Sequence, residues 1–443
     1  MSRRAYPHYR PSCVEWLGDV PEQWEIKALK RTFTTLNGAT PKSGNPEYWD
    51  GDIPWATPDD LGNLRGSTLD VTSRMITQEG YASCGVTLAA EGSLVLSTRA
   101  PIGHLVIAGV RLCTNQGCRS LVFRGDDDRR FFFYQLFAAR PKLQSLGQGS
   151  TFTELSRDCL TSTYLVSPPL DEQRAIAAFL DRETARIDGL IEKKQRQIEL
   201  LQEKRSALIS HAVTKGLDPN AKMKDSGIEW LGDVPKHWEV IAIKRITIVP
   251  VTDGPHETPE LLDEGIPFIS AEAIKNDRID FAKMRGFISP EDHARFSKKY
   301  KPLKGDIYLI KSGATTGNVA FVDTDDEFNI WSPLAAIRPD PKKAITPFVF
   351  FFMKSKNFFQ SIELGWSFGT QQNIGMNVIE NIPIALPSIE EQRAIAAFLD
   401  RETARIDALD EMINHSIETL REYRTALISA AVTGKIDVRG EVA

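Results

Sequence analysis

Several segments of the chain occur twice, and this duplication constrains its fold more than any other feature. Residues 172–188, which read Glu-Gln-Arg-Ala-Ile-Ala-Ala-Phe-Leu-Asp-Arg-Glu-Thr-Ala-Arg-Ile-Asp, return unchanged as residues 391–407, a spacing of 219. A shorter block, Glu-Trp-Leu-Gly-Asp-Val-Pro, occurs at residues 15–21 and again at 229–235, a spacing of 214. Such a period is far longer than the roughly 20–50 residues of solenoid and propeller repeats. The sequence therefore predicts two copies of a whole domain, each followed by a helix.

The longer repeated segment has the composition of a long helix. From Leu170 to Val213 it contains no Pro and a single Gly, and it is rich in the strong helix formers Ala, Glu, Arg, Leu and Gln. Two prolines at 168–169 suit a helix start, and Lys215-Gly216 suits its end. The second copy is expected to begin at Ser388, a candidate N-cap, and to end near Gly434.

Apolar residues occupy equivalent positions in both helices, at steps that are mostly three, four or seven residues. This spacing is typical of a coiled coil, and two copies in one chain can pair with each other antiparallel. Arg205 and Arg424 interrupt the stripe at equivalent positions. The predicted seam consists of Ile187, Leu190, Ile198, Leu201 and Leu208 in the first helix, and of Ile406, Leu409, Ile417, Leu420 and Leu427 in the second.

A second apolar patch lies at the start of each helix. It consists of Ile176, Phe179 and Leu180 in the first copy, and of Ile395, Phe398 and Leu399 in the second. Core packing against the adjacent domain is one interpretation. The other is a docking surface recognised by two copies of one partner, because identity over 17 residues, charges included, exceeds what core packing demands.

The regions between the repeated segments barely align with each other. Both mix short apolar runs with Gly, Pro, Asn and Thr turns, and strands are expected at residues 53–55, 93–97, 266–268 and 306–310. Aromatic-rich helices are expected at residues 129–139 and 348–359. We therefore predict an α+β fold with two globular modules (residues 1–167 and 217–386, here module 1 and module 2) and two spacer helices (residues 168–216 and 387–443).

Polar loops that contain Gly follow the predicted strands and are candidates for DNA contact. Asn, Gln and Arg can form paired hydrogen bonds with adenine or guanine edges, whereas Ser, Thr and Lys suit phosphates. Loops of this composition are also common on any protein surface. The candidates are Lys42, Ser43, Ser97, Thr98, Arg99, Asn115, Gln116, Ser150 and Thr151 in module 1, and Lys311, Ser312, Thr315, Thr316, Gln371, Gln372 and Asn373 in module 2.

Several classes of function find no support in the sequence. The net charge of −5 argues against a globally basic nucleic-acid coat but leaves local basic grooves open. Five cysteines without a Cys-x-x-Cys pair argue against a zinc ribbon, and no metal site is expected. No amino-methyltransferase motif, nuclease motif or phosphate-binding loop is complete, so we expect no active site. No apolar run is long enough to cross a membrane and no secretion signal is present, so we expect a cytoplasmic protein.

Taken together, the doubled motifs resemble the specificity subunits of type I restriction-modification systems over essentially the full length. The resemblance rests on the twinned Trp-Leu-Gly-Asp-Val-Pro blocks at 16–21 and 230–235 and on the twinned helix starts at 168–188 and 387–407. Gly-Asp-Ile-Pro-Trp at 51–55 and residues 92–103 resemble the strands of the family's target-recognition domains. Module 2 keeps Ile-Pro-Phe at 266–268 but has Ser-Gly-Ala-Thr-Thr-Gly at 312–317 in place of the latter.

The resemblance implies that each module reads one half of a bipartite site in double-stranded DNA, with the helices setting the gap. It also implies two methylation subunits docked on the helices, restriction subunits in the full complex, and S-adenosylmethionine, ATP and Mg carried by those partners, with no cofactor in this chain. Two alternatives remain open at this stage. The chain could be the partner of a combined methyltransferase and nuclease, or a coiled-coil scaffold that binds protein without DNA specificity.

Overall fold

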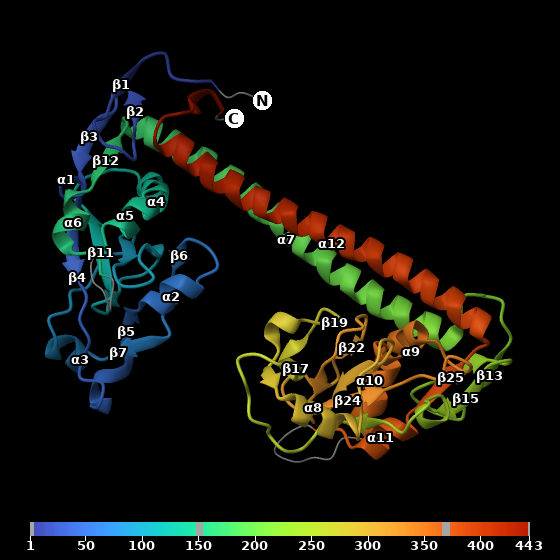
Figure 1. The fold of residues 1–443 in the computed structure, drawn as a ribbon. Coiled ribbons are helices and arrows are strands. Elements are labelled where there is room, and N and C mark those ends of the chain that lie inside the picture. The colour runs from blue at the N-terminus through green and yellow to red at the C-terminus, as the bar shows by residue number, and fades with distance from the viewer. Residues whose placement is uncertain (1–3, 148–153, 366–372, 442–443) are drawn as a thin grey trace. The chain divides into compact units, whose positions relative to one another are not determined.

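A computed structural model describes residues 4–147, 154–365 and 373–441 (Figure 1). The chain divides into two compact units, one made of residues 1–194 and 415–443 and the other of residues 195–414. The predicted α+β class is confirmed, because each unit combines a module of strands and short helices with parts of two long helices. The division into modules and spacer helices at residues 167, 216 and 386 stays a prediction. No helix in the described part of the chain is both long enough and apolar enough to cross a membrane.

In unit 1, two sheets form the frame of module 1. The larger has the strand order β4-β11-β8-β9-β6, and the smaller has the order β10-β5-β7. The strands of the larger sheet are β4 (Phe33–Asn37), β11 (Cys118–Phe123), β8 (Leu94–Ser97), β9 (Leu105–Ala108) and β6 (Thr68–Leu69). Those of the smaller sheet are β10 (Cys113–Thr114), β5 (Trp49–Ala56) and β7 (Arg74–Ile76).

Short helices and two further strand pairs complete unit 1. The predicted helix at 129–139 is confirmed as α4 (Arg129–Ala138), which Asp128 caps by accepting a hydrogen bond from the backbone nitrogen of Phe131 at 2.8 Å. The other helices are α1 (Leu29–Thr32), α2 (Pro58–Asn63), α3 (Gln78–Ser83), α5 (Arg140–Ser145) and α6 (Arg157–Ser162). The strand pairs are β1 (Tyr9–Pro11) with β2 (Asp19–Pro21), and β3 (Glu25–Ala28) with β12 (Tyr164–Ser167).

Module 2 repeats this arrangement in unit 2, although its sequence barely aligns with that of module 1. One sheet has the order β16-β24-β21-β22, and the other has the order β20-β17-β23. The strands of the first are β16 (Thr252–Asp253), β24 (Leu334–Ile337), β21 (Ile307–Ile310) and β22 (Val319–Phe321). Those of the second are β20 (Gly286–Ile288), β17 (Ile266–Ile269) and β23 (Asn329–Ile330), and β23 runs parallel to β17 as β10 runs parallel to β5.

The remaining elements of unit 2 include one correction to the sequence-based expectation. The helix predicted at 348–359 is two helices, α9 (Thr346–Met353) and α10 (Lys356–Leu364), because Ser355 caps the second by accepting a hydrogen bond from the backbone nitrogen of Phe358. The other helices are α8 (Pro290–Ser297) and α11 (Met376–Asn381). The strand pairs are β13 (Met223–Asp225) with β14 (Asp233–Pro235), β15 (Glu239–Ala242) with β25 (Pro383–Leu386), and β18 (Ile274–Lys275) with β19 (Arg278–Ile279).

Both predicted long helices are present, as α7 (Leu170–Lys215) and α12 (Ile389–Val432). Ser388 caps α12 as expected, since its hydroxyl accepts a hydrogen bond from the backbone nitrogen of Glu391 at 3.2 Å. Each helix is followed by a glycine with positive φ, Gly216 at 78° and Gly434 at 72°. Glycine adopts this left-handed conformation without steric cost, so it ends a helix readily.

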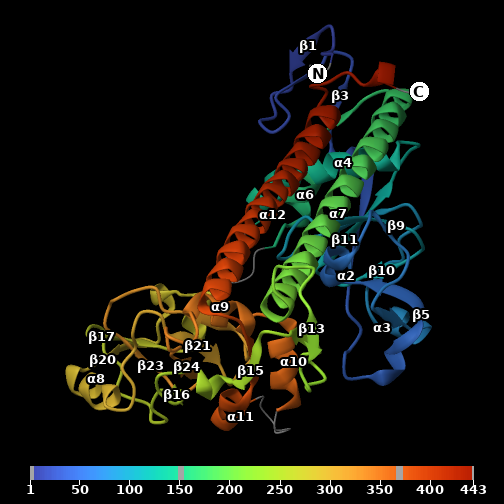
Figure 2. The ribbon, with the colours of Figure 1, turned by 90° about the vertical axis from the view of Figure 1, so that its right-hand side faces the viewer.

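The two helices pair antiparallel, and Figures 1 and 2 show them side by side. In unit 1, Arg424 lies 2.9 Å from Asp188, and in unit 2, Arg205 lies 2.9 Å from Asp407. Residue 188 of α7 is therefore opposite residue 424 of α12, and residue 205 of α7 is opposite residue 407, as antiparallel helices require. These are equivalent residues at the spacing of 219, so the two arginines that interrupt the apolar stripe form the same ion pair once in each unit.

The buried part of the seam differs in detail from the predicted one. Ile187, Ile406, Ile417 and Leu427 are buried, and Ile198, Leu201, Leu208 and Leu420 are half-buried. Leu190 and Leu409 are exposed. In the first helix Ile191 packs against the core of unit 1 instead, because an α-helix of 3.6 residues per turn drifts away from a strict seven-residue stripe.

A buried glutamine joins each module to the start of its helix. Gln173 accepts a hydrogen bond from the backbone nitrogen of Asp128 at 2.8 Å and donates one to the carbonyl of Pro168 at 2.9 Å. Gln392 accepts a hydrogen bond from the backbone nitrogen of Ile345 and donates to the carbonyl of Pro387, both at 2.9 Å. The repeated Glu-Gln-Arg sequence therefore satisfies buried backbone groups at the first turn of α4 and of α9.

Candidate nucleic-acid interface

Three loops of module 1 meet at the ends of strands β8, β10 and β4. The backbone nitrogens of Thr98 and Arg99 both donate to the carbonyl of Gly117, at 2.8 and 3.3 Å. The Thr40 hydroxyl donates to the side-chain oxygen of Gln116 at 2.5 Å. The loops that carry the predicted residues 97–99 and 115–116, which are far apart in sequence, therefore lie side by side in the structure.

Burial divides these residues into two groups. Ser97 and Thr98 are fully buried, and the Ser97 hydroxyl donates to the carbonyl of Pro101 at 2.7 Å. They hold the loops together and offer nothing to a ligand. Arg99 and Gln116 are exposed, and Asn115 is half-exposed while its side-chain oxygen accepts from the backbone nitrogen of Gly117.

Two further arginines belong to this surface, although they are absent from the sequence-based candidates. Arg119 donates to the side-chain oxygen of Asn37, and Arg157 donates to the hydroxyl of Thr35 at 3.2 Å. Burial lowers the pKa of Arg119, the nearby carboxylate of Glu154 raises it, and the charges of Arg157 and Arg99 lower it. The same carboxylate lies 3.1 Å from the Nε atom of Arg99. Only the pairing of β4 with β11 brings Arg119 and Arg157 together, so no short-range sequence signal could have identified them.

Module 1 has two other sets of candidates, residues 42–43 and residues 150–151. Lys42 and Ser43 are exposed, in the loop between β4 and β5. Ser150 and Thr151 lie outside the described residues, as do Gln371 and Gln372 of module 2.

The matching surface of module 2 has a different chemistry. Lys311 follows β21 as Thr98 follows β8, but its side chain is buried and its ammonium lies 3.2 Å from the carboxylate of Asp253. Asp253 also accepts a hydrogen bond from Lys299 at 2.5 Å. Burial alone would raise the pKa of Asp253, but these lysines outweigh that effect and lower it below 3.8. Lys311 is thus paired within the module, with a carboxylate that it shares with Lys299.

Polar side chains surround this buried pair. Ser312 and Asn373 face each other across an isolated antiparallel bridge, and Asn373 is exposed. Thr315 is exposed, and the Thr316 hydroxyl donates to the carbonyl of Gly313 at 2.6 Å. Nearby in the same module, the guanidinium of Arg285 stacks on the ring of Trp331 at 3.9 Å.

The apolar patches at the two helix starts lie inside the cores of their units. Ile176, Phe179 and Leu180 are buried in unit 1, Ile395 and Leu399 are buried in unit 2, and Phe398 is half-buried. Of the two interpretations that the sequence left open for these apolar patches, their burial agrees with core packing.

The exposed side of each repeated helix start is a stripe of basic and small residues. Arg174, Ala178, Arg182 and Arg186 follow one another at steps of four, and all four are exposed. Residues four apart lie on one helix face. The same four residue types are exposed in unit 2, as Arg393, Ala397, Arg401 and Arg405. We call these eight residues the basic helix face.

Comparison with known proteins identifies the family. The family model described as type I restriction modification DNA specificity domain matches residues 21–200 and 235–419, once for each module with its helix. The chain belongs to this family. Within the described residues, no cluster of His, Cys, Asp and Glu side chains could hold a metal ion.

Individual relatives agree with this assignment. The chain is 34% identical to the MjaIX specificity subunit of Methanocaldococcus jannaschii over 189 residues, an alignment that covers 42% of this chain and 43% of that protein. It is 25% identical to the putative MjaX specificity subunit of the same organism, over 96% of both chains. It is 24% identical to the EcoBI specificity subunit of Escherichia coli, over 73% of this chain and 69% of that protein.

Two solved structures share the fold. One, from work on complex assembly and conformational transition of the type I restriction-modification system, superposes with a TM-score of 0.70 at 16% identity and covers 96% of this chain and 99% of that one. The other is the specificity subunit HsdS of Thermoanaerobacter tengcongensis, with a TM-score of 0.53 at 15% identity and coverage of 96% and 98%.

Proposed function

We propose that this specificity subunit reads a bipartite site in double-stranded DNA, with one half recognised by each module. The observation that carries the proposal is that the two modules share the order of four strands in one sheet and of three in the other, but present different side chains at the same sheet positions. Where β4 and β11 bring Asn37 and Arg119 together, β16 and β24 pair Asp253 with Ala335. The residues that follow Thr98 and Lys311, which are Arg99 and Ser312, also differ. Two modules with a similar strand framework but different side chains are suited to reading two different half-sites.

In module 1 the exposed side chains suggest how bases are read. Arg99 and Gln116 are the residue types that form paired hydrogen bonds with guanine and adenine in the major groove, so they are our candidates for base readout. Arg119 and Arg157 flank them and are candidates for phosphate contacts, which supply affinity but no sequence information. In module 2 the corresponding candidates are Ser312, Thr315, Thr316 and Asn373, together with Arg285.

The two helices act as the spacer between the half-sites and as the docking surface for two copies of a methylation subunit. Core packing accounts for the identity of the buried residues in each helix start, but it places no constraint on exposed ones. The basic helix face is nevertheless identical in the two units, including Ala178 and Ala397, which allow close approach of another helix. We infer that it binds an acidic surface present once on each methylation subunit.

In this proposal the chemistry lies on the partners. The methylation subunits supply S-adenosylmethionine and the methyl transfer to adenine, and restriction subunits supply ATP-driven cleavage. This chain contributes recognition and assembly. The proposed boundaries of its parts are residues 1–167 and 217–386 for the recognition modules, and 168–216 and 387–443 for the helices.

A methylome tests the proposal directly. The chain is expressed with the methylation subunit of its own system in a host without adenine methylation, and modified bases are mapped by long-read sequencing. We expect methylated adenines in a motif with two specified halves and an unspecified gap, and none when this chain is omitted. Unchanged methylation, with the two proteins still co-purifying, would leave only the scaffold alternative.

A further inference from the structure

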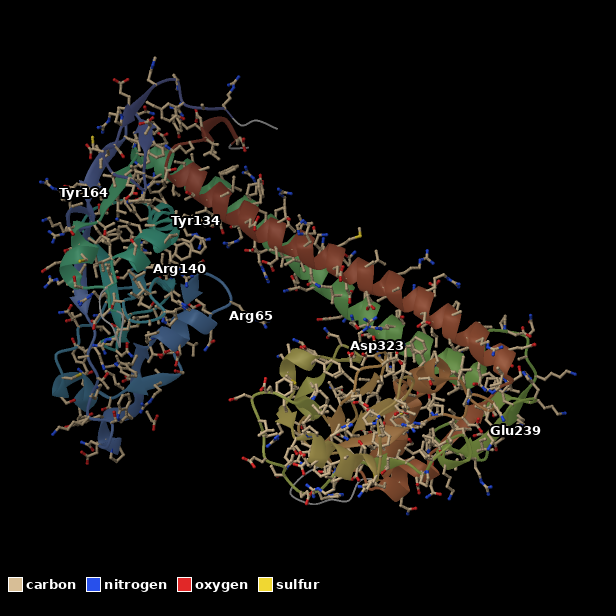
Figure 3. All side chains as sticks on the ribbon, viewed as in Figure 1. Arg65, Tyr134, Arg140, Tyr164, Glu239 and Asp323 are labelled. Atoms are coloured by element: carbon tan, nitrogen blue, oxygen red, sulfur yellow. The ribbon has the colours of Figure 1, made fainter. Side chains whose placement is uncertain are left out.

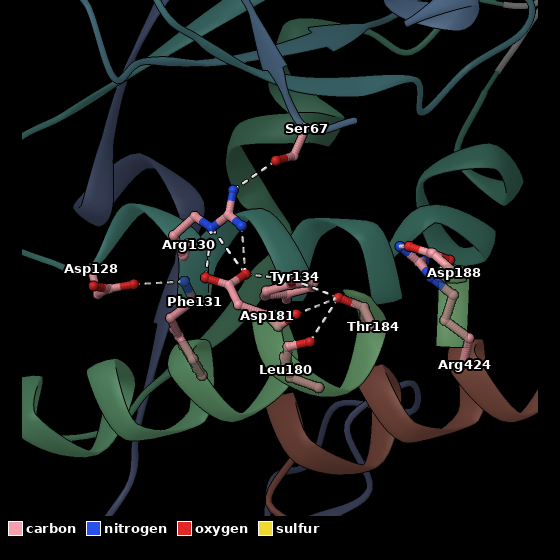
Figure 4. Close-up of polar contacts among 10 residues, drawn as sticks. All are labelled: Ser67, Asp128, Arg130, Phe131, Tyr134, Leu180, Asp181, Thr184, Asp188 and Arg424. Atoms are coloured by element: carbon pink, nitrogen blue, oxygen red, sulfur yellow. Dashed lines mark hydrogen bonds and ion pairs between the residues drawn. The ribbon is translucent and has the colours of Figure 1, made fainter. Parts of the chain in front are cut away.

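Asp181, in the repeated segment of α7, forms an ion pair with module 1. The Nε atom of Arg130 lies 3.0 Å from both of its carboxylate oxygens, and Nη2 lies 2.6 Å from Oδ1 (Figure 4). The hydroxyl of Tyr134 donates to the same oxygen at 2.6 Å. Burial, with the hydrogen bond to Asp181, raises the pKa of Tyr134 to about 12, so this donor keeps its proton at physiological pH. Arg130 and Tyr134 both lie on α4.

Arg130 also reaches the sheet of module 1. Its Nη1 atom donates to the hydroxyl of Ser67 at 2.6 Å, and the carbonyl of Ser67 accepts a hydrogen bond from the backbone nitrogen of Ile107 in β9 at 2.7 Å. The planar guanidinium therefore connects three elements, which are α7, α4 and the loop that leads into β6. Two guanidinium nitrogens bond to one carboxylate, so the contact fixes the angle between the two groups as well as the distance between them.

A groove of about 460 Å³ separates the loop around Ser67 from the two long helices at this place. Tyr134 and Arg140 line it from the module, and Asp188 and Arg424 line it from the helices (Figures 3 and 4). Close apolar packing does not fill this space. The paired contact between the Arg130 guanidinium and the Asp181 carboxylate, here called the fork, joins module 1 to α7 beside this groove. The hydroxyls of Tyr134 and Thr184 also lie 3.2 Å apart, and the guanidinium of Arg424 lies 5.8 Å from the ring of Phe137.

The identical residue of the second helix, Asp400, has a different environment. Module 2 has Pro347 and Phe351 at the second and sixth positions of α9, where α4 has Arg130 and Tyr134. Neither can donate a hydrogen bond from its side chain. Asp400 is exposed and, within the described residues, no side chain forms an ion pair with it. Partial burial of its carboxyl group raises its pKa.

Module 2 is tied to the helices by another route. Asp277, in the turn between β18 and β19, pairs with Lys354 and lies 4.0 Å from Arg205 of α7. Arg205 is the residue that also pairs with Asp407 of α12. Burial lowers the pKa of Lys354. The two modules therefore use unrelated ion pairs to reach the same pair of helices.

We propose that Arg130 is a positioning residue that fixes the orientation of module 1 on α7 and thereby the gap length that the subunit accepts. This inference rests on the proposed function. Without the fork, module 1 remains attached through the apolar core around Phe131 and Phe179 and through the hydrogen bond from Asp128 to Gln173 at the helix start, but it loses the contact that fixes its angle two turns further along α7. The subunit then tolerates a half-site displaced by one base pair.

The repeated helices supply a matched control for the test. Asp181→Ala removes the fork, whereas Asp400→Ala removes the same residue from an identical stretch where no fork exists. Both proteins are assembled with their methylation subunits, and methyl transfer is measured on duplexes with the native gap and with gaps one base pair longer or shorter. We expect Asp181→Ala to raise the ratio of altered-gap to native-gap methylation by about threefold to tenfold and Asp400→Ala to leave it unchanged.

Further variants separate positioning from folding. Arg130→Lys keeps the charge but cannot form the fork, so it should relax gap discrimination as Asp181→Ala does, and the double variant Arg130→Lys with Asp181→Ala should add nothing. Equal behaviour of the Asp181 and Asp400 variants would overturn the proposal. So would a loss of native-gap methylation in an intact complex without any gain on altered gaps. If the unmodified subunit shows no gap preference at all, the proposed function itself fails, and not only this inference.

Discussion

At the residue scale, the difference between the modules is clearest at Asp253 and its lysines. Lys311 was expected on the DNA surface because it follows a strand in a polar loop, but it is buried against Asp253. The loop sequence shows the position of Lys311 and not its partner, since Asp253 lies 58 residues earlier, in a strand that does not pair directly with β21. Sequence could therefore place the candidate loops, but it could not separate the side chains that face outward from those that hold the loops together.

The pKa of Asp253 gives a pH-dependent prediction. A carboxylate whose pKa is lowered on folding stabilises the fold at pH values above its unfolded pKa, and this contribution is lost as pH falls through the folded pKa. Asp253→Asn should therefore lower the unfolding free energy of unit 2 by about 3 kcal/mol at pH 7, because the buried Lys311 loses its counter-charge. The difference should shrink as the pH is lowered below about 4.

The measurement is denaturant unfolding at a series of pH values, followed by fluorescence. Asp325→Asn serves as the control, because its pairing with Lys304 is largely exposed and should contribute little. A destabilisation by Asp253→Asn that is the same at pH 3 and pH 7 would contradict this electrostatic account.

At the element scale, the long helices were the most predictable part of the chain. Their composition, their flanking prolines and glycines and their duplication located both ends to within a few residues. What the heptad pattern could not show was that Arg205 and Arg424 cross to the opposite helix, because a sequence pattern for one helix does not contain the register of the partner. The apolar run at 348–359 likewise concealed the break before Ser355.

The repeated ion pairs of the helix seam can be tested by exchange of charge. Asp407→Arg places two arginines opposite each other and should destabilise unit 2 by about 1 kcal/mol, since the pair is partly exposed. Arg205→Asp combined with Asp407→Arg should restore most of that loss. Thermal melting of the single and double variants provides the measurement, and the equivalent exchange of Arg424 with Asp188 should behave alike. A double variant no more stable than Asp407→Arg alone would contradict antiparallel pairing in this register.

At the scale of the whole molecule, the duplication revealed the architecture before any strand was placed. Two identical helix starts and two identical blocks required two equivalent frames, and both units share the strand order of these frames apart from β6, which only the larger sheet of module 1 contains. The bases that each module reads could not be inferred, because side chains such as Arg119 and Arg157 become neighbours only through strand pairing, and because DNA shape also contributes to specificity. We expect the two modules to recognise DNA separately, each from its own frame.

The measurement that tests this claim most directly is the methylome of a subunit with module 1 in both places. Residues 22–167 replace residues 236–386, so that both repeated helices are kept and Asp400 receives an Arg130 partner from the new module. If each module reads its half-site independently, the methylated motif will have a second half that is the inverted copy of its first, with the gap still present. A complex that assembles and methylates DNA but keeps the original second half would contradict this expectation.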